Sequence, residues 1–172
     1  MNRLYVFCEG PDDIRFFEGV LREHLQEGYD DIRMIGYAGM KHIRVDGFIR
    51  GIGAMGDDYL MVADIDQKRS VKAKKRMLMD WYRELDEQKI IIVIKEIEGW
   101  YLAGLDKKAS SLLGIRYSPS TDRITKERFN QMIPEKYHSR IDLMIEIIRL
   151  YTIAVAVRKN RSFRFFHTHF LE

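Results

Sequence analysis

Three acidic residues occupy positions that often carry chemistry in proteins built from alternating strands and helices. Glu9 directly follows the apolar run Leu4–Cys8, and Asp64 and Asp66 end a second run that begins at Tyr59. Ligands of open parallel sheets bind beyond the carboxyl ends of the strands, where the strand order reverses. If these two strands are neighbours, the three carboxylates meet at one edge of the sheet. The i, i+2 spacing of the aspartates also predicts that both share one strand face, with Cα atoms about 6.5 Å apart.

Carboxylates this close repel each other, so at least one pKa should rise unless a cation neutralises the group. Mg²⁺ prefers oxygen ligands and often takes one or two carboxylates together with phosphate oxygens. We therefore expect Mg²⁺, with Mn²⁺ as a substitute, at Glu9, Asp64 and Asp66. A later apolar run is followed by Glu96 and Glu98, which again have i, i+2 spacing. One of these two glutamates could supply a fourth metal ligand, and we favour Glu98.

Positive charge is clustered although the net charge of the chain is only +3. Six basic residues and no acidic residue lie between Lys68 and Arg76. Such clustering is typical of proteins that bind polyanions, and a lysine-rich helix face in solvent gives the same pattern. A further lysine follows the second strand-like run, again at a carboxyl end. The residues expected to contact phosphates are Lys41, Lys68, Arg69 and Lys72.

Strand-like and helical patterns alternate along the first part of the chain. The strand-like runs span residues 4–8, 32–37, 59–66 and 90–94, and the helical patterns between them span 11–27, 42–50 and 70–87. This order predicts an α/β fold with a four-stranded parallel, Rossmann-like sheet flanked by helices, in the strand order 2-1-3-4. The remaining patterns are helical and include one long helix over 139–157. We expect an α/β domain over residues 1–105 and a helical C-terminal extension, packed on it, over 106–172.

Composition excludes several classes of protein. A single cysteine among 172 residues excludes a disulfide scaffold and a multi-cysteine zinc site. The first residues show no signal-peptide pattern, and no apolar run is long enough for a bilayer, so we expect a cytoplasmic protein without a membrane partner. The G-x-G-x-x-G pattern at 51–56 follows a helix and not a strand. We interpret it as a helix stop, expect no nucleotide cofactor, and expect Trp81 to be packed.

The acidic residues carry a resemblance to a known family. Glu9-Gly10 after the first strand and Asp64-Ile65-Asp66 after the third resemble the motifs of the Toprim family, over roughly residues 1–105. Two further segments are similar to elements of small stand-alone Toprim-type proteins, Glu98-Gly99-Trp100-Tyr101-Leu102-Ala103 and Ser162-Phe163-Arg164-Phe165-Phe166. The segment from Val6 to Asp13 is similar both to those proteins and to OLD-type nucleases. The resemblance implies a four-stranded parallel sheet whose acids bind Mg²⁺.

The function implied by this resemblance is a Mg²⁺-dependent nuclease or related phosphoryl-transfer enzyme acting on DNA or RNA. In that hypothesis Asp64 and Asp66 hold the metal, and Glu9 is a ligand or a general acid/base. The chain lacks a topoisomerase domain with a nucleophilic tyrosine and a primase zinc-binding domain, which argues against those two activities. One alternative is a non-catalytic subunit that binds metal and nucleic acid and works with a partner ATPase. Another is a plain α/β fold whose acids cap helices, which predicts no metal binding.

Overall fold

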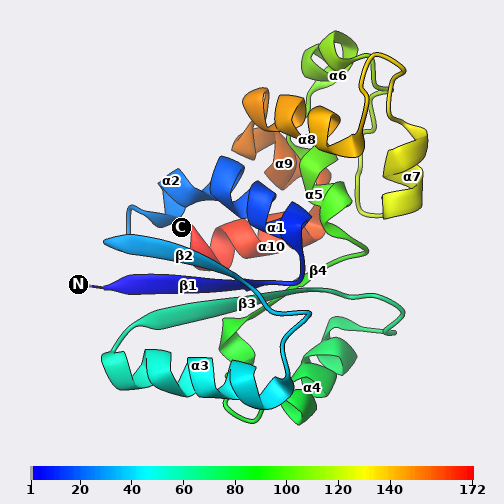
Figure 1. Ribbon diagram of the computed structural model, residues 1–172. Coiled ribbons are helices and arrows are strands. Elements are labelled where there is room, and N and C mark those ends of the chain that lie inside the picture. The colour runs from blue at the N-terminus through cyan, green and yellow to red at the C-terminus, as the bar shows by residue number, and fades with distance from the viewer. Residues whose placement is uncertain (1) are drawn as a thin grey trace. The chain divides into compact units, whose positions relative to one another are not determined.

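A computed structural model describes residues 2–172 and contains a four-stranded, fully parallel sheet (Figure 1). Its strands are β1 (Arg3–Cys8), β2 (Asp31–Gly36), β3 (Asp58–Asp64) and β4 (Ile90–Val93). The strand order is β2-β1-β3-β4. Val6 is level with Met34 of β2 on one side and with Leu60 of β3 on the other. The predicted α/β fold with its parallel sheet is therefore confirmed, and so is the prediction that the first and third strands are neighbours.

Helices cover both faces of this sheet (Figure 1). One face carries α1 (Pro11–Phe16), the π-helical turn η1 (Phe17–Leu21) and α2 (Arg22–Leu25), and the other carries α3 (His42–Met55) and α4 (Val71–Trp81). The middle strands β1 and β3 are apolar and buried along most of their length, whereas the edge strand β2 carries Asp31 and the exposed Arg33. Every residue of β4 is buried. In β1, Tyr5 and Phe7 join the core beneath α3 and α4.

Helix α3 is longer than its sequence predicted. It continues through Gly51 and Gly53 and stops at Gly56, whose φ of 71° is left-handed and whose amide donates to the Gly53 and Ile52 carbonyls. The predicted end near residue 50 was therefore wrong, because the glycines inside the pattern do not break the helix. Only the last glycine has the left-handed conformation that ends helices.

Helix α4 begins where its sequence predicted and ends earlier. The Ser70 side chain accepts a hydrogen bond from the Ala73 amide, which confirms Ser70 as the N-cap. The helix stops at Trp81 and not near Glu87, because Tyr82 takes an extended conformation and is buried, with 4% of its surface exposed. A short 3₁₀ turn, η2 (Glu87–Lys89), then leads into β4.

The chain forms two compact units, Met1–Ile92 and Val93–Glu172. The helices of the second unit are α5 (Ile97–Ala103), α6 (Lys107–Leu113), α7 (Lys126–Gln131), α8 (Arg140–Arg149), α9 (Ile153–Lys159) and α10 (Arg161–Phe170). None of the helices described in either unit has the length and apolar character needed to cross a membrane.

The predicted long helix over 139–157 is wrong, because the chain breaks between α8 and α9. The Tyr151 hydroxyl donates to the Trp100 carbonyl at 2.9 Å, and the Thr152 amide donates to the Gly104 carbonyl at 3.1 Å. The Tyr151 ring lies against Gly104 so closely that a β-carbon there would overlap it. These tertiary contacts with α5 and its end fix the break, and the local apolar pattern does not reveal them.

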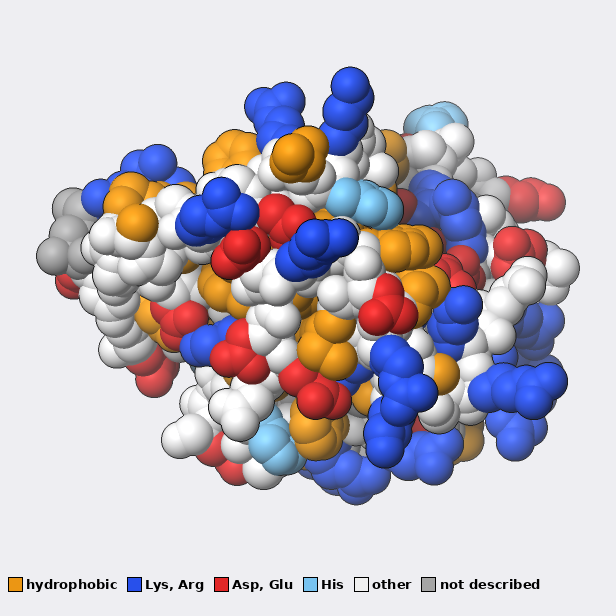
Figure 2. Space-filling model, turned by 90° about the horizontal axis from the view of Figure 1, so that it is seen from below, with side chains coloured by type: hydrophobic (Ala, Val, Ile, Leu, Met, Phe, Trp, Pro, Cys, Tyr) orange, Lys and Arg blue, Asp and Glu red, His pale blue; other side chains and the backbone are white. Residues whose placement is uncertain are grey.

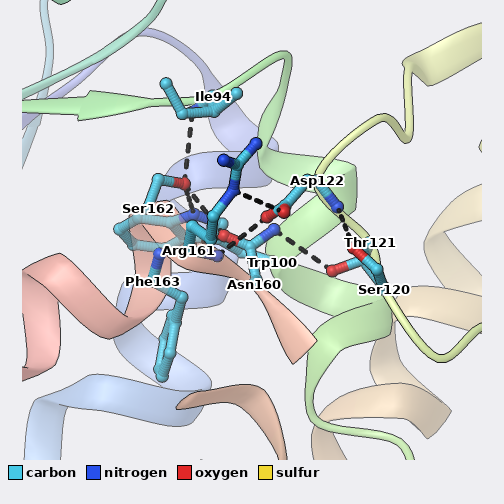
Figure 3. Close-up of polar contacts among 9 residues, drawn as sticks. All are labelled: Ile94, Trp100, Ser120, Thr121, Asp122, Asn160, Arg161, Ser162 and Phe163. Carbon is cyan, nitrogen blue, oxygen red and sulfur yellow. Dashed lines mark hydrogen bonds and ion pairs between the residues drawn. The ribbon is translucent and has the colours of Figure 1, made fainter. Parts of the chain in front are cut away.

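A buried hydrogen-bond network within the second unit joins the start of α10 to α5 and to Ile94 (Figure 3). Ser162 Oγ accepts from the Trp100 indole at 2.8 Å and from the Ile94 amide at 3.2 Å, and it donates to Asn160 Oδ1 at 2.9 Å. Asn160 also caps α10 by accepting from the Phe163 amide. Phe163 packs edge-on against Trp100 at 5.1 Å. The tryptophan segment and the Ser-Phe segment singled out in the sequence thus form one structural core.

Candidate functional site

Glu9 and Asp64 meet at the carboxyl edge of the sheet. Glu9 is the first residue after β1, and Asp64 is the last residue of the neighbouring β3. The Asp64 backbone lies close enough to the Glu9 carboxylate to lower its pKa. Topology therefore brings together two residues that are far apart in the sequence, as we expected from the strand order.

Asp66 belongs to the same edge but not to the strand. Because β3 ends at Asp64, Asp66 lies in the following turn with a left-handed φ of 52°, and its side chain is 58% exposed. The prediction that Asp64 and Asp66 share one strand face was therefore wrong. An aspartate tolerates this backbone region better than most residues, because its short polar side chain can hydrogen-bond locally.

Lys74 supplies a positive charge within the acidic cluster. Only 2% of the residue is exposed, and its ammonium forms an ion pair with Asp66 and lies 3.9 Å from Glu9 Oε1. Lys74 stands one helical turn before Leu78 on the buried face of α4. In the sequence it is one of the six basic residues between Lys68 and Arg76, which predicts no separate role for it. The four-residue spacing from Leu78 was the signal that could have identified it.

Tyr37, which follows β2, is the second site residue that the sequence did not indicate. Its buried hydroxyl lies 3.1 Å from the Val62 carbonyl oxygen and 3.3 Å from Glu9 Oε1, so its one proton is shared between these two acceptors. Burial, followed by the neighbouring charge of Glu9, raises the Tyr37 pKa far above its usual range. Tyr37 is therefore a neutral hydrogen-bond donor that fixes one oxygen of Glu9.

The environment of Glu9 raises its pKa. Burial is the largest cause, and the nearby Asp66 adds to it. Lys74, the hydrogen bond from Tyr37 and the Asp64 backbone act in the opposite direction. A carboxyl group with a raised pKa holds its proton closer to neutral pH, and this suits a group that transfers protons.

The oxygen donors at this edge are of the type that Mg²⁺ takes, but they do not form a ready-made cage. Within residues 2–172, no group of three or more His, Cys, Asp or Glu side chains is arranged to hold a metal ion. Mg²⁺ sites commonly use only one or two carboxylates and complete the shell with water and phosphate oxygens. Glu9 and Asp64, which lie close together at the ends of the two strands, suit a site of that open kind.

Glu98 and Glu96 lie in the second unit, and each has a partner there. Glu98, on α5, is 3% exposed, and its Oε1 accepts from Arg140 at 2.7 Å. Glu96 precedes α5 and accepts from the Lys126 amide. Because β4 ends at Val93, the prediction that these glutamates share a strand face was wrong. The role of Glu98 as a fourth metal ligand stays a prediction.

The lysines and the arginine predicted to contact phosphate are exposed and make no ion pair with any residue in the described range 2–172. Lys41 stands at the N-cap of α3, and the other three lie in the turn after Asp66 and at the start of α4. Figure 2 looks onto the molecule from the side of α3 and α4, and many Lys and Arg side chains stand out on that face among hydrophobic and acidic ones. The four residues predicted to contact phosphate are Lys41, Lys68, Arg69 and Lys72.

Comparisons with known proteins do not assign the chain to a family. No family model matches the chain, and neither the curated proteins nor the solved structures contain a significant match. The similarity to Toprim proteins therefore rests on the motifs quoted from the sequence, and the fold with its edge of acidic residues rests on the structure.

Proposed function

We propose that this protein is a Mg²⁺-dependent, Toprim-type nuclease or a related phosphoryl-transfer enzyme that acts on nucleic acid. The observation that supports the proposal best is the close approach of Glu9 and Asp64 across the carboxyl ends of β1 and β3. Ligands of parallel sheets bind at this edge. Asp66 and exposed cations lie next to the pair in sequence and add the charges that phosphodiester chemistry needs.

Each residue of the site has a role in this proposal. Asp64 and Asp66 hold the metal, and Glu9 is a further ligand or the group that accepts and returns a proton. Bound Mg²⁺, or Mn²⁺ in its place, would polarise a phosphoryl oxygen and neutralise developing charge. Tyr37 keeps Glu9 oriented through its hydroxyl. The exposed cations, Lys41, Lys68, Arg69 and Lys72, bind backbone phosphates on either side of the reacting bond.

A second candidate is a non-catalytic subunit that binds nucleic acid and works with a partner ATPase. Lys74 favours this candidate, because its buried ammonium already neutralises Asp66 and lies close to Glu9. An acidic cluster with an internal counter-charge does not require a metal ion to be stable. In this case the edge of the sheet would serve for binding and not for cleavage.

Calorimetric titration of Mg²⁺ and Mn²⁺ tests the proposal, followed by cleavage assays on single- and double-stranded DNA and RNA. The wild type and an Asp80→Asn control, which alters an exposed acid on α4, should bind metal and cleave equally. Asp64→Asn should lose both properties. Binding of nucleic acid without cleavage under every metal condition would support the non-catalytic subunit. Cleavage that survives in Asp64→Asn would refute the assigned site.

A further inference from the structure

An exposed pair of stacked aromatic rings lies at the junction of α3 and α4. The imidazole of His42, the first residue of α3, and the indole of Trp81, the last residue of α4, have centroids 5.2 Å apart and planes inclined by 19°. Trp81 is 46% exposed, and His42 is exposed as well. The sequence predicts that Trp81 lies in a helix and is packed; it does end α4 and packs on His42, but 46% of its surface stays exposed. A large apolar ring left in solvent costs hydration free energy unless a ligand covers it.

Buried rings connect this pair to the acidic edge of the sheet. His42 meets Tyr82 edge-on at 5.0 Å, and Tyr82 meets Tyr37 edge-on at 6.1 Å. Tyr37 in turn hydrogen-bonds Glu9. Both tyrosines are only 4% exposed, so they form a fixed support beneath the outer pair. The exposed rings are therefore held in place, and only two ring contacts separate them from a side chain that touches Glu9.

Charge around the rings favours an anionic ligand. Lys41 directly precedes His42, and Lys68, Arg69 and Lys72 lie at the opposite end of the helix that ends in Trp81. Acids near the rings are the exposed Asp80, which directly precedes Trp81, Asp46, which accepts the Glu84 amide, and Glu84, which pairs with Arg50. A ligand with a flat apolar ring and negative charges at both ends would match both features.

We infer that the Trp81–His42 pair is a stacking platform for an unpaired base of single-stranded nucleic acid. The inference rests on the proposed function in taking nucleic acid as the ligand, and it adds which form of it binds. Aromatic side chains stack on any base, because every base has a π-face, so the platform gives affinity without sequence preference. Bases inside a duplex are covered by their neighbours and cannot reach the rings. The platform therefore selects single strands and holds one beside the acidic edge.

Tryptophan fluorescence measures this binding directly. The chain has two tryptophans, and Trp100 is fully buried, so quenching by an added oligonucleotide reports on Trp81. We would titrate short single-stranded DNA and RNA, and duplexes of equal length, into the full chain in EDTA, where no metal-dependent cleavage occurs. Quenching should follow binding of the single strands and be weak or absent with the duplexes.

Variants then locate the contact by fluorescence anisotropy of labelled oligonucleotides. Trp81→Ala should weaken single-strand binding about 5- to 150-fold, and Trp81→Phe should retain most of the affinity. His42→Ala should weaken binding in the same direction. The matched control is Phe165→Ala, because Phe165 is 51% exposed and stacks on His169 at 3.9 Å in the second unit. That variant should bind like the wild type.

Several results would overturn the platform. It fails if Trp81→Ala and His42→Ala bind single strands as tightly as the wild type. Rings that bind a protein partner, and not nucleic acid, would give this same result. It fails if Phe165→Ala loses as much affinity, or if duplexes depend equally on Trp81. Its failure is separable from failure of the proposed function. Cleavage that is lost in Asp64→Asn, with Trp81→Ala binding unchanged, refutes only the platform, and Trp81-dependent binding without any cleavage refutes only the nuclease.

Discussion

Lys74 and Asp66 form an ion pair whose partners differ sharply in exposure, so the cost of breaking it should depend on which partner is removed. The side chain of Lys74 is 3% exposed, and that of Asp66 is 58% exposed. Asp66→Asn leaves the ammonium buried, with Glu9 Oε1 at 3.9 Å as the remaining counter-charge. Lys74→Met keeps an apolar stem of similar length and leaves Asp66 where water can hydrate it.

The magnitudes follow from burial. Removing one partner of a fully buried pair costs roughly 3–5 kcal/mol, because a charge stays buried without compensation. Glu9 compensates Lys74 in part, so we expect Asp66→Asn to lower the free energy of unfolding by about 2–3 kcal/mol. Asparagine tolerates the left-handed backbone at this position, so backbone strain adds little. For Lys74→Met we expect a loss of about 1 kcal/mol, since the abandoned carboxylate is largely hydrated.

Urea unfolding at neutral pH, followed by circular dichroism, gives these free energies. The double variant Lys74→Met/Asp66→Asn leaves no buried ammonium, so its stability should be close to that of Lys74→Met alone. Asp80→Asn, which removes an exposed acid on the same helix, should change stability by less than about 0.5 kcal/mol. The reasoning is refuted if Asp66→Asn costs no more than Lys74→Met, or if the two losses simply add in the double variant.

Two further predictions concern single groups. Lys74 lowers the pKa of Glu9, so Lys74→Met should raise that pKa further. An acid whose pKa is higher in the folded than in the unfolded protein loses stability as the pH rises from the unfolded value through the folded one. The free energy of unfolding should therefore fall more steeply between about pH 4 and 7 for Lys74→Met than for the wild type. ¹³C NMR of the Glu9 carboxyl measures its pKa directly, and an unchanged Glu9 pKa in Lys74→Met would contradict the assigned contact. The second prediction concerns Ser162→Ala, which removes the acceptor of the Trp100 indole. It should lower the free energy of thermal unfolding by about 2–4 kcal/mol. The control Ser111→Ala, at an exposed serine, should lower it by less than about 0.5 kcal/mol, and similar losses in both variants would show that the network contributes little.

The strands could be predicted because each depends on the apolar residues within its own run, and their order followed from the general rule for crossovers. Runs such as Ile90–Val93 have no polar face, and this is how a strand buried on both sides appears in a sequence. Right-handed crossovers then leave few orders, and the observed one brings Glu9 next to Asp64. The position of these two residues at the edge of the sheet followed from topology alone.

The remaining features depend on contacts between distant residues. The break at Tyr151 is fixed by Gly104 and Trp100, and no local pattern announces it. Lys74 looked like a solvated lysine because its neighbours in the sequence are basic, although Asp66 and the buried face of α4 determine its environment. Trp81 packs only on one side, because α4 ends at this residue and leaves 46% of its surface exposed.

The network around Ser162 also constrains how the protein can be made. The first unit is continuous from the start of the chain to Ile92, so all of its residues have left the ribosome while later ones are still being added. The second unit takes Ser162 and Phe166 from its last helix, and the capping residue Asn160 before it, into its core. Until that helix has been synthesised, the Trp100 indole lacks its acceptor Ser162 and its ring lacks its contacts with Phe163 and Phe166. Vectorial synthesis therefore imposes an order on folding, in which the sheet can form early and the helical unit closes only after translation has reached α10.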